Sequence, residues 1–251
     1  MIDIFSLPLF YISFKPSKAV EDHYKRYGFT NVHHFEAVNG KKLDPDKLRG
    51  DNLITIRSYD DLKAGRRVPA GMPSLGAIGC TLSHYELWSM CVKKGWPYII
   101  IAEQDNHINR LDDKIIRDII NTLEKPRGMF LSAKRKKRDH YDKHFYGTHF
   151  YFATMDACRE MVRNCFPIDV QTDWYIKHLG QQKAITLEGY ELSSQKNSVG
   201  SSIQAMCMTC LLPQSPWPYI GVALVFIIVI ILYIISRRNL SKCRESCSSS
   251  I

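Results

Sequence analysis

The stretch Gly76-Ala77-Ile78-Gly79-Cys80-Thr81-Leu82-Ser83-His84, with Tyr-Ile-Ile-Ile-Ala-Glu-Gln-Asp at 98–105, carries the strongest fold and site signals of this chain. Residues 98–102 form an apolar run typical of a strand buried on both faces. The run ends at Glu103 and Asp105, which lie two positions apart and so project from the same side of a strand. Hard cations such as Mn²⁺ or Mg²⁺ prefer carboxylate oxygens, so we expect a divalent cation here that can hold a diphosphate.

Composition sets the class of protein. A chain of 251 residues with 45% hydrophobic and 24% charged residues is ordinary for a globular protein. Its formal net charge of +9 favours anionic partners such as nucleotides, phosphates or an anionic membrane face. The positive charge is largely scattered, and the sequence has no legible zinc-finger or RNA-binding motif. We therefore expect no nucleic-acid partner.

Predicted strands alternate with predicted helices along the body of the chain. This alternation favours an α/β fold with a mostly parallel sheet flanked by helices. Residues 41–73 are polar and punctuated by Pro and Gly, and we expect a long loop with little regular structure. The predicted strands are 10–14, 32–38, 98–102, 129–132, 150–154 and 185–188; the predicted helices are 17–27, 80–94, 111–123 and 155–165, with a helical turn at 173–179.

Two groups of residues are candidates for phosphate binding. Ser83 and His84 follow a Gly-rich turn near a predicted helix start, where free backbone N–H groups can face a phosphate. The alternative is that Thr81 or Ser83 only caps the helix. Arg66 lies shortly before this stretch and either clamps a phosphate or is an ordinary loop charge.

Asp169 and Asp173 are candidates for acid–base chemistry. They lie in the segment Ile-Asp-Val-Gln-Thr-Asp-Trp at 168–174, which places two acids near aromatic residues. One of them can act as a general base on an acceptor hydroxyl. The alternative is that Asp169, Thr172 or Asp173 only caps a helix.

Residues 219–236 are predicted to form one C-terminal transmembrane helix. The run is uncharged, dominated by Ile, Val and Leu, and close to the minimum length needed to cross a bilayer. Trp217 on one side and Arg237 on the other suit the two membrane interfaces. We expect a juxtamembrane tether at 206–218 and a short basic, Ser- and Cys-rich tail at 237–251.

Two features of the sequence bear on which side of the membrane the body of the chain lies. Lys and Arg residues follow the segment, which by the positive-inside rule places the tail in the cytosol. Residues 2–14 are apolar but lack the basic start and the cleavage site of a secretory signal. Insertion after synthesis would then leave the body in the cytosol. We expect a cytosol-facing body, with a lumenal orientation as the alternative.

The eight cysteines have no disulfide-scaffold spacing. Cys207 and Cys210 form a C-x-x-C pair without a second pair or a His motif, so no zinc site is expected there. Together with Cys243 and Cys247 they flank the apolar segment. They are candidates for S-palmitoylation, or else inert reduced thiols.

Several motifs in order along the chain resemble glycosyltransferase family 25. The most specific is the Gly-x-Ile-Gly-Cys-x-Leu-Ser-His-x-x-x-Trp block at 76–88. It is preceded by an apolar segment at 10–14 and Phe-Glu-Ala-Val-Asn-Gly at 35–40. It is followed by Glu-Gln-Asp at 103–105, Gly-Thr-His-Phe-Tyr at 147–151 and the acidic segment 169–174.

The resemblance implies a GT-A-like, Rossmann-like catalytic domain over residues 1–205. It implies inverting transfer of a sugar from UDP to a hydroxyl of a glycan, lipid-linked or protein acceptor, with Mn²⁺ (or Mg²⁺) as cofactor. Galactose is the sugar that the resemblance leads us to expect. The implied roles are Asp105 as main metal ligand, Glu103 on metal or ribose, Ser83, His84, Arg66, Thr148 and His149 on the nucleotide-sugar, and Asp173, then Asp169, as base.

Two positions depart from the family pattern. Gln104 replaces the middle acid of the Glu-Asp-Asp triplet, and Ala77 replaces an acid inside the Gly-rich block. Each change removes a negative charge and weakens cation binding if the position contributes to it. The alternative function is therefore a catalytically inactive, membrane-anchored binding module.

Overall fold

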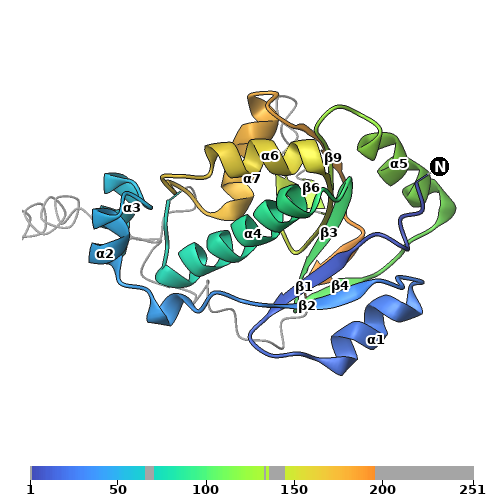
Figure 1. Ribbon diagram of the computed structural model, residues 1–251, viewed down its shortest axis with the longest axis horizontal. Helices are drawn as coiled ribbons and strands as arrows, with labels where there is room; N and C mark the ends of the chain where they lie inside the picture. The colour runs from blue at the N-terminus through green and yellow to red at the C-terminus, as the bar shows by residue number, and fades with distance from the viewer. Residues whose placement is uncertain (1, 66–70, 133, 136–144, 196–251) are drawn as a thin grey trace, which may run out of the picture. The chain divides into compact units, whose positions relative to one another are not determined.

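The computed structural model describes residues 2–65, 71–132, 134–135 and 145–195, all within the compact unit Met1–Met206 (Figure 1). The strands are β1 (Leu9–Ser13), β2 (Val32–Glu36), β3 (Tyr98–Glu103), β4 (Asn106–Ile108), β5 (Gly128–Leu131), β6 (Lys134–Arg135), β7 (Phe145–Tyr146), β8 (Phe150–Thr154), β9 (Thr186–Gly189) and β10 (Ser193–Gln195). The helices are α1 (Lys18–Arg26), the 3₁₀ helix η1 (Gly40–Lys42), α2 (Pro45–Gly50), α3 (Ile56–Lys63), α4 (Leu75–Lys94), α5 (Asp113–Leu123), α6 (Met155–Asn164) and α7 (Thr172–Gln181).

The centre of the fold is a six-stranded mixed sheet with the order β2-β1-β3-β8-β5-β9. Strand β1 is parallel to β2 and β3, and β5 is parallel to β9, whereas β8 runs antiparallel to both of its neighbours. The predicted α/β class is confirmed, with β8 as the antiparallel exception. Two small antiparallel pairs, β10 with β4 and β6 with β7, lie outside this sheet.

Helices cover both faces of the sheet and bury two separate apolar cores. Alternate side chains of one strand enter opposite cores, so that Phe10 and Ile12 pack with α4, α6 and α7 while Leu9 and Tyr11 pack with α1 and α5. Figure 1 shows α4, α6 and α7 grouped together and α1 and α5 apart from them. Burial on both faces explains why residues 98–102 are apolar without alternation.

Helix α4 begins earlier than its sequence predicts. Ser74 caps it by accepting a hydrogen bond from the Ala77 backbone N–H, and Gly95 ends it in the left-handed conformation. The prediction of a Gly-rich turn before a helix start near residue 80 was wrong, because Gly76 and Gly79 lie inside the first turns. Small residues are needed there, since a Cβ at Gly79 would lie 2.5 Å from the Val38 carbonyl oxygen.

The segment 41–73 is not the unstructured loop that its polarity predicts. It contains the end of η1 and the helices α2 and α3. Asp44 accepts a hydrogen bond from the Asp46 N–H and Pro45 occupies the first turn of α2, while Thr55 caps α3. These local start signals outweigh the low hydrophobicity of two short helices.

The predicted transmembrane segment, 219–236, lies outside the described residues, as do the tether and tail predicted on either side. Among the residues that the structure does describe, none of the helices has both the length and the apolar character needed to cross a membrane.

Candidate active site

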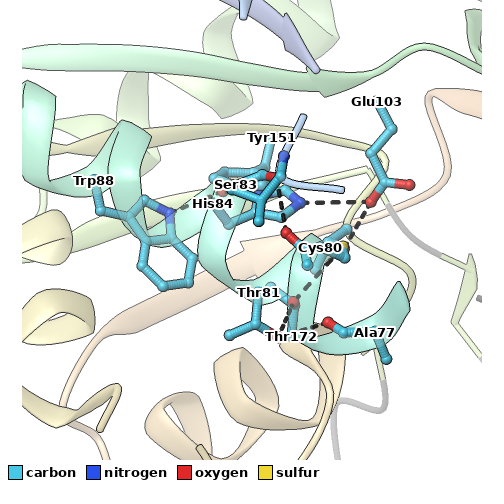
Figure 2. Close-up of polar contacts among 12 residues, drawn as sticks. Ala77, Cys80, Thr81, Ser83, His84, Trp88, Glu103, Tyr151 and Thr172 are labelled. Carbon is cyan, nitrogen blue, oxygen red and sulfur yellow. Dashed lines mark hydrogen bonds and ion pairs between the residues drawn. The ribbon is translucent and has the colours of Figure 1, made fainter. Parts of the chain in front are cut away.

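Helix α4 and strand β3 bring three metal-ligating side chains together. Cys80 and His84 lie four residues apart and so share one face of the helix. With Glu103 at the end of β3, each offers a ligand atom within 4.8 Å of the other two. Figure 2 shows the His84 ring facing the Glu103 carboxylate, with Nε2 and Oε1 3.6 Å apart. The Glu103 side chain is 20% exposed while that of His84 is fully buried, so a ligand in solvent can reach this group through Glu103.

Tyr151 and Trp88 hold the His84 ring in place. His84 Nδ1 lies 2.7 Å from the Tyr151 hydroxyl, which also accepts a hydrogen bond of 2.8 Å from Trp88 Nε1. Burial raises the pKa of Tyr151 well above its usual range, so the hydroxyl stays neutral. With Nδ1 turned toward Tyr151, the other ring nitrogen, Nε2, faces Glu103. The 3.6 Å between Nε2 and Glu103 Oε1 is too long for a hydrogen bond.

Glu103 is held as a carboxylate by its neighbours. Thr148 Oγ1 donates a 3.0 Å hydrogen bond to Oε1, and the Glu103 backbone N–H donates to the His149 carbonyl. Burial works to raise the pKa of Glu103, but its contact with His84, the charge of His84 and His149, and the Thr148 hydrogen bond outweigh burial and lower that pKa. Glu103 is therefore ionised at neutral pH.

Asp105 lies in the turn after β3, beside the same group. The Cys80 thiol lies close enough to Glu103, Asp173 and Asp105 to feel the charge of all three. Burial, and then these three charges, raise the pKa of the thiol. Glu103 and Asp105 are both partly exposed, so neither is packed away in a core. Gln104 between them is exposed, and its backbone N–H donates to the Ile12 carbonyl.

The start of α7 closes the site from another side. The Thr172 hydroxyl lies 2.9 Å from that of Thr81 and 3.8 Å from Cys80 Sγ. The next residue, Asp173, accepts a hydrogen bond from the Trp174 backbone N–H. Burial, together with the nearby charge of Glu103, raises the pKa of Asp173 despite this hydrogen bond. Asp173 is thus a carboxyl group with increased proton affinity, next to an ionised glutamate.

The predicted base Asp169 does not join this group. Its carboxylate accepts hydrogen bonds from Thr55 Oγ1 at 2.6 Å and from Arg57 Nη1 at 3.2 Å, which fix α3 to the segment before α7. Asp169 also lines a cavity of about 290 Å³, together with Tyr175 and His178. These contacts give Asp169 a structural role and leave Asp173 as the acid beside Glu103.

Ser83 also differs from its predicted phosphate-binding role. Its hydroxyl accepts a hydrogen bond from the Val38 N–H and donates one to the Gly79 carbonyl, and the residue is 1% exposed. It lies inside α4, where its own N–H is not free, and Ser74 is the capping residue instead of Thr81 or Ser83. Arg66 lies outside the described residues. His84, Thr148 and His149 all contact or adjoin Glu103.

Sequence reasoning missed three members of the site. Cys80 carries a readable signal, because a Cys and a His four positions apart on a predicted helix lie on one face. Tyr151 and Thr172 carry none, because only the packing of β8 and α7 against α4 places them beside His84 and Cys80.

Comparison with known proteins agrees with the motifs. A model of glycosyltransferase family 25 (LPS biosynthesis protein) matches residues 8–196. This match places the chain, with its helix-flanked mixed sheet and its acids at a strand end, in the class of glycosyltransferase-family proteins. The chain belongs to glycosyltransferase family 25, which confirms the resemblance predicted from the sequence.

Individual relatives match over shorter segments. A Drosophila melanogaster glycosyltransferase 25 family member is 36% identical over 72 residues, 29% of this chain and 11% of that protein. A rat protein named "Probable inactive glycosyltransferase 25 family member 3" is 29% identical over 90 residues, 34% of this chain and 15% of that protein. The chain therefore matches only a small part of each relative's length. The solved apo structure of mouse xyloside xylosyltransferase 1 has a TM-score of 0.38 at 9% identity, covering 73% of this chain and 71% of that one.

Proposed function

We propose that this protein is a metal-dependent glycosyltransferase that transfers a sugar from a UDP-sugar to an acceptor hydroxyl. The observation that carries the proposal is the position of an ionised Glu103 and of Asp105, two residues apart at the end of β3, near Asp173, whose pKa is raised. Ligands of open α/β sheets bind beyond the carboxyl ends of the strands, where these residues lie.

Glu103 and Asp105 are the residues that would hold Mn²⁺ or Mg²⁺. The donor set fits, because both are carboxylates, the ligand type that hard cations prefer. The lowered pKa of Glu103 keeps it in the charged form that a metal ligand needs. When bound, such an ion offsets the charge that develops on a leaving diphosphate.

Asp173 is the proposed general base. Its raised pKa strengthens its affinity for the proton of an acceptor hydroxyl. The hydroxyl oxygen forms the new bond to the anomeric carbon, Asp173 takes the proton, and the bond to UDP breaks with its electron pair on the diphosphate. Attack from the face opposite the leaving group inverts the anomeric carbon. Galactose as the sugar and a glycan, lipid-linked or protein hydroxyl as the acceptor are the expectations that family membership supports.

Turnover of UDP-sugars by the purified chain in Mn²⁺ tests this proposal. UDP-galactose is expected to be the best donor in a panel, and Asp105→Ala is expected to abolish metal-dependent turnover. Asp60→Asn is the matched control, because Asp60 is an exposed acid on α3. Full activity of the Asp105→Ala protein would reject the assignment.

The second candidate function is a catalytically inactive module that binds a ligand or partner at a membrane. The replacement of an acid by Gln104 favours it, as does the similarity to relatives named inactive. Ala77, the other departure, is 1% exposed and packs in the apolar core, where an acid would be costly without further changes. Calorimetry with UDP and Mn²⁺ separates the two functions, since the inactive module is expected to show no metal-dependent UDP binding.

Residues 219–236 are proposed to anchor the protein in a membrane, with the body facing the cytosol. The uncharged length of the segment and its Trp and Arg flanks support an anchor. Protease treatment of intact microsomes tests the direction. Digestion of the body is expected, and protection of the body would establish the lumenal orientation instead.

A further inference from the structure

We propose that Cys80, His84 and Glu103 form a binding site for a divalent transition metal of borderline softness, of the Zn²⁺ class. This site differs from the hard-cation site proposed above, although both use Glu103. It offers one sulfur, one imidazole nitrogen and one carboxylate oxygen, the three ligand types that Zn²⁺ takes in proteins. Calcium or magnesium would not select a thiol.

The distances suit a small ion after a modest contraction. The three ligand atoms lie within 4.8 Å of one another, and His84 Nε2 is 3.6 Å from Glu103 Oε1. Bonds of about 2.0 to 2.3 Å in a tetrahedral site place ligand atoms about 3.3 to 3.6 Å apart. The nitrogen–oxygen pair is already at this spacing. The Cys80 sulfur lies no more than 4.8 Å from the other two ligand atoms, so it needs to approach by at most about 1.5 Å.

The second observation is the buried nitrogen of His84. The side chain is 0% exposed, and Nε2 has no hydrogen-bond partner among the described residues. A buried polar atom without a hydrogen bond is uncommon and calls for an explanation. A metal ion bound by His84 Nε2, Cys80 Sγ and Glu103 Oε1 would provide the missing partner of Nε2.

Each of the three ligands already has an outer hydrogen-bond partner. Thr172 donates to Cys80 Sγ, the Tyr151 hydroxyl contacts His84 Nδ1, and Thr148 donates to Glu103 Oε1. Such second contacts orient metal ligands and are typical of natural zinc sites. For ligation by Nε2, the neutral ring carries its proton on Nδ1 and donates it to the Tyr151 oxygen.

The charges balance when the ion binds. The Cys80 thiol releases its proton to solvent as the sulfur–metal bond forms, and the ion exchanges three waters for the protein ligands. One thiolate and one carboxylate then neutralise a divalent cation, so no net charge is buried. The partly exposed Glu103 provides the entry path, and a water keeps the fourth position.

Occupancy by Zn²⁺ would withdraw Glu103 from the proposed hard-cation site. Zn²⁺ is therefore expected to inhibit Mn²⁺-dependent turnover, a consequence that rests on the proposed function. Metal binding itself does not depend on it, and it is measured below without UDP-sugar or Mn²⁺.

Cobalt absorption spectroscopy tests the site directly. The full chain is used with Cys207, Cys210, Cys243 and Cys247 replaced by Ser, so that these residues do not contribute thiolate ligands. Titration with Co²⁺ is expected to produce a near-ultraviolet thiolate-to-metal band that saturates at one equivalent and is removed by Zn²⁺. Absence of this band would overturn the proposal while leaving the transferase proposal intact.

Variants assign the band to its ligands. Cys80→Ser is expected to remove it and to weaken Zn²⁺ binding by more than about 100-fold, because losing only a second contact costs about 10- to 100-fold. Glu103→Gln, at a partly exposed position, is expected to keep the band but weaken binding. The buried Cys165→Ser control is expected to change neither. A band that survives in the Cys80→Ser protein would overturn the assignment.

Discussion

Two carboxyl groups of the site, Glu103 and Asp173, are shifted in opposite directions. Burial opposes ionisation of both, but His84, His149 and Thr148 outweigh it at Glu103 and lower that pKa. At Asp173, burial and the charge of Glu103 outweigh three backbone hydrogen bonds, from Gly147, Asp173 and Trp174, and raise the pKa. Carboxyl groups whose environments separate their pKa values suit different chemical roles, here a charged metal ligand and a base.

Asp173→Asn is the sharpest test of the proposed base. We expect the turnover rate of UDP-sugar to fall by about 10² to 10⁴-fold, the usual contribution of a positioned base. In the unmodified protein, activity should fall as pH drops through the raised pKa of Asp173, since the base must be deprotonated. A pH–rate profile and calorimetry of UDP binding check this. A variant that still transfers sugar at the normal rate would contradict it.

The same substitution is expected to stabilise the fold. A raised pKa means that the folded state binds the Asp173 proton more tightly than the unfolded state. Stability is therefore lost as pH rises from the ordinary value of 3.8 through the raised folded value. At neutral pH Asp173→Asn should unfold at higher urea concentration than the unmodified protein, and the difference should shrink near pH 3. Equal urea midpoints for Asp173→Asn and the unmodified protein at neutral pH would refute the expected stabilisation.

At the scale of elements, α4 organises the site. Its first turns press against the segment from β2 to η1, and the Ser83 hydroxyl ties the two together through the Val38 N–H. Its next turns present Cys80 and His84 to β3. A Cβ at Gly40 would lie 2.2 Å from the Leu75 carbonyl oxygen, so the two backbones approach as closely as glycine allows. The position of the ligands thus depends on this contact.

Gly79→Ala should disturb this contact. The added Cβ would lie 2.5 Å from the Val38 oxygen and 2.9 Å from the Gly40 nitrogen, both backbone atoms that cannot move alone. We expect a loss of about 1 to 3 kcal/mol in the free energy of unfolding, the usual cost of overpacking. Gly50→Ala is the control, since nothing lies within 4 Å of its added Cβ. Urea denaturation measures the stability of both variants. Equal unfolding midpoints for Gly79→Ala and the unmodified protein would contradict the expected clash.

At the scale of the whole molecule, the six-stranded sheet separates two apolar cores. The buried residues of both cores lie between Ile4 and Leu192. Strand β9 completes the sheet by pairing with β5, and Ile185 and Leu192 are buried near the end of the described chain. All residues of the two cores thus lie within the described part of the chain, and β9 forms one edge of the sheet.

A fragment of residues 1–206 is expected to fold alone. It retains both cores and every described strand, and cooperative urea unfolding monitored by tryptophan fluorescence should demonstrate this. A shorter fragment, 1–181, lacks β9 and the buried Ile185 and Leu192, and should lose the cooperative transition. If 1–206 unfolded without cooperativity, residues beyond it would be required for the fold.

The sequence by itself determined the alternating elements, the family and the acids at the end of β3. These depend on local features: apolar runs such as 98–102, caps and turns, and motifs read in order along the chain. Where a local feature was overlooked, as with the Asp44-Pro45 helix start, the prediction of a loop was wrong.

Only the tertiary structure decided which distant residues meet. It placed Asp173, and not Asp169, beside Glu103, assigned Ser83 to a backbone contact, and joined Cys80 and His84 to Tyr151 and Thr172. The physical reason is that these contacts join residues far apart in the chain. They arise where α4 packs against β3, β8, α7 and the segment after β2, and where α3 meets the segment before α7. Local periodicity carries no information about such packing.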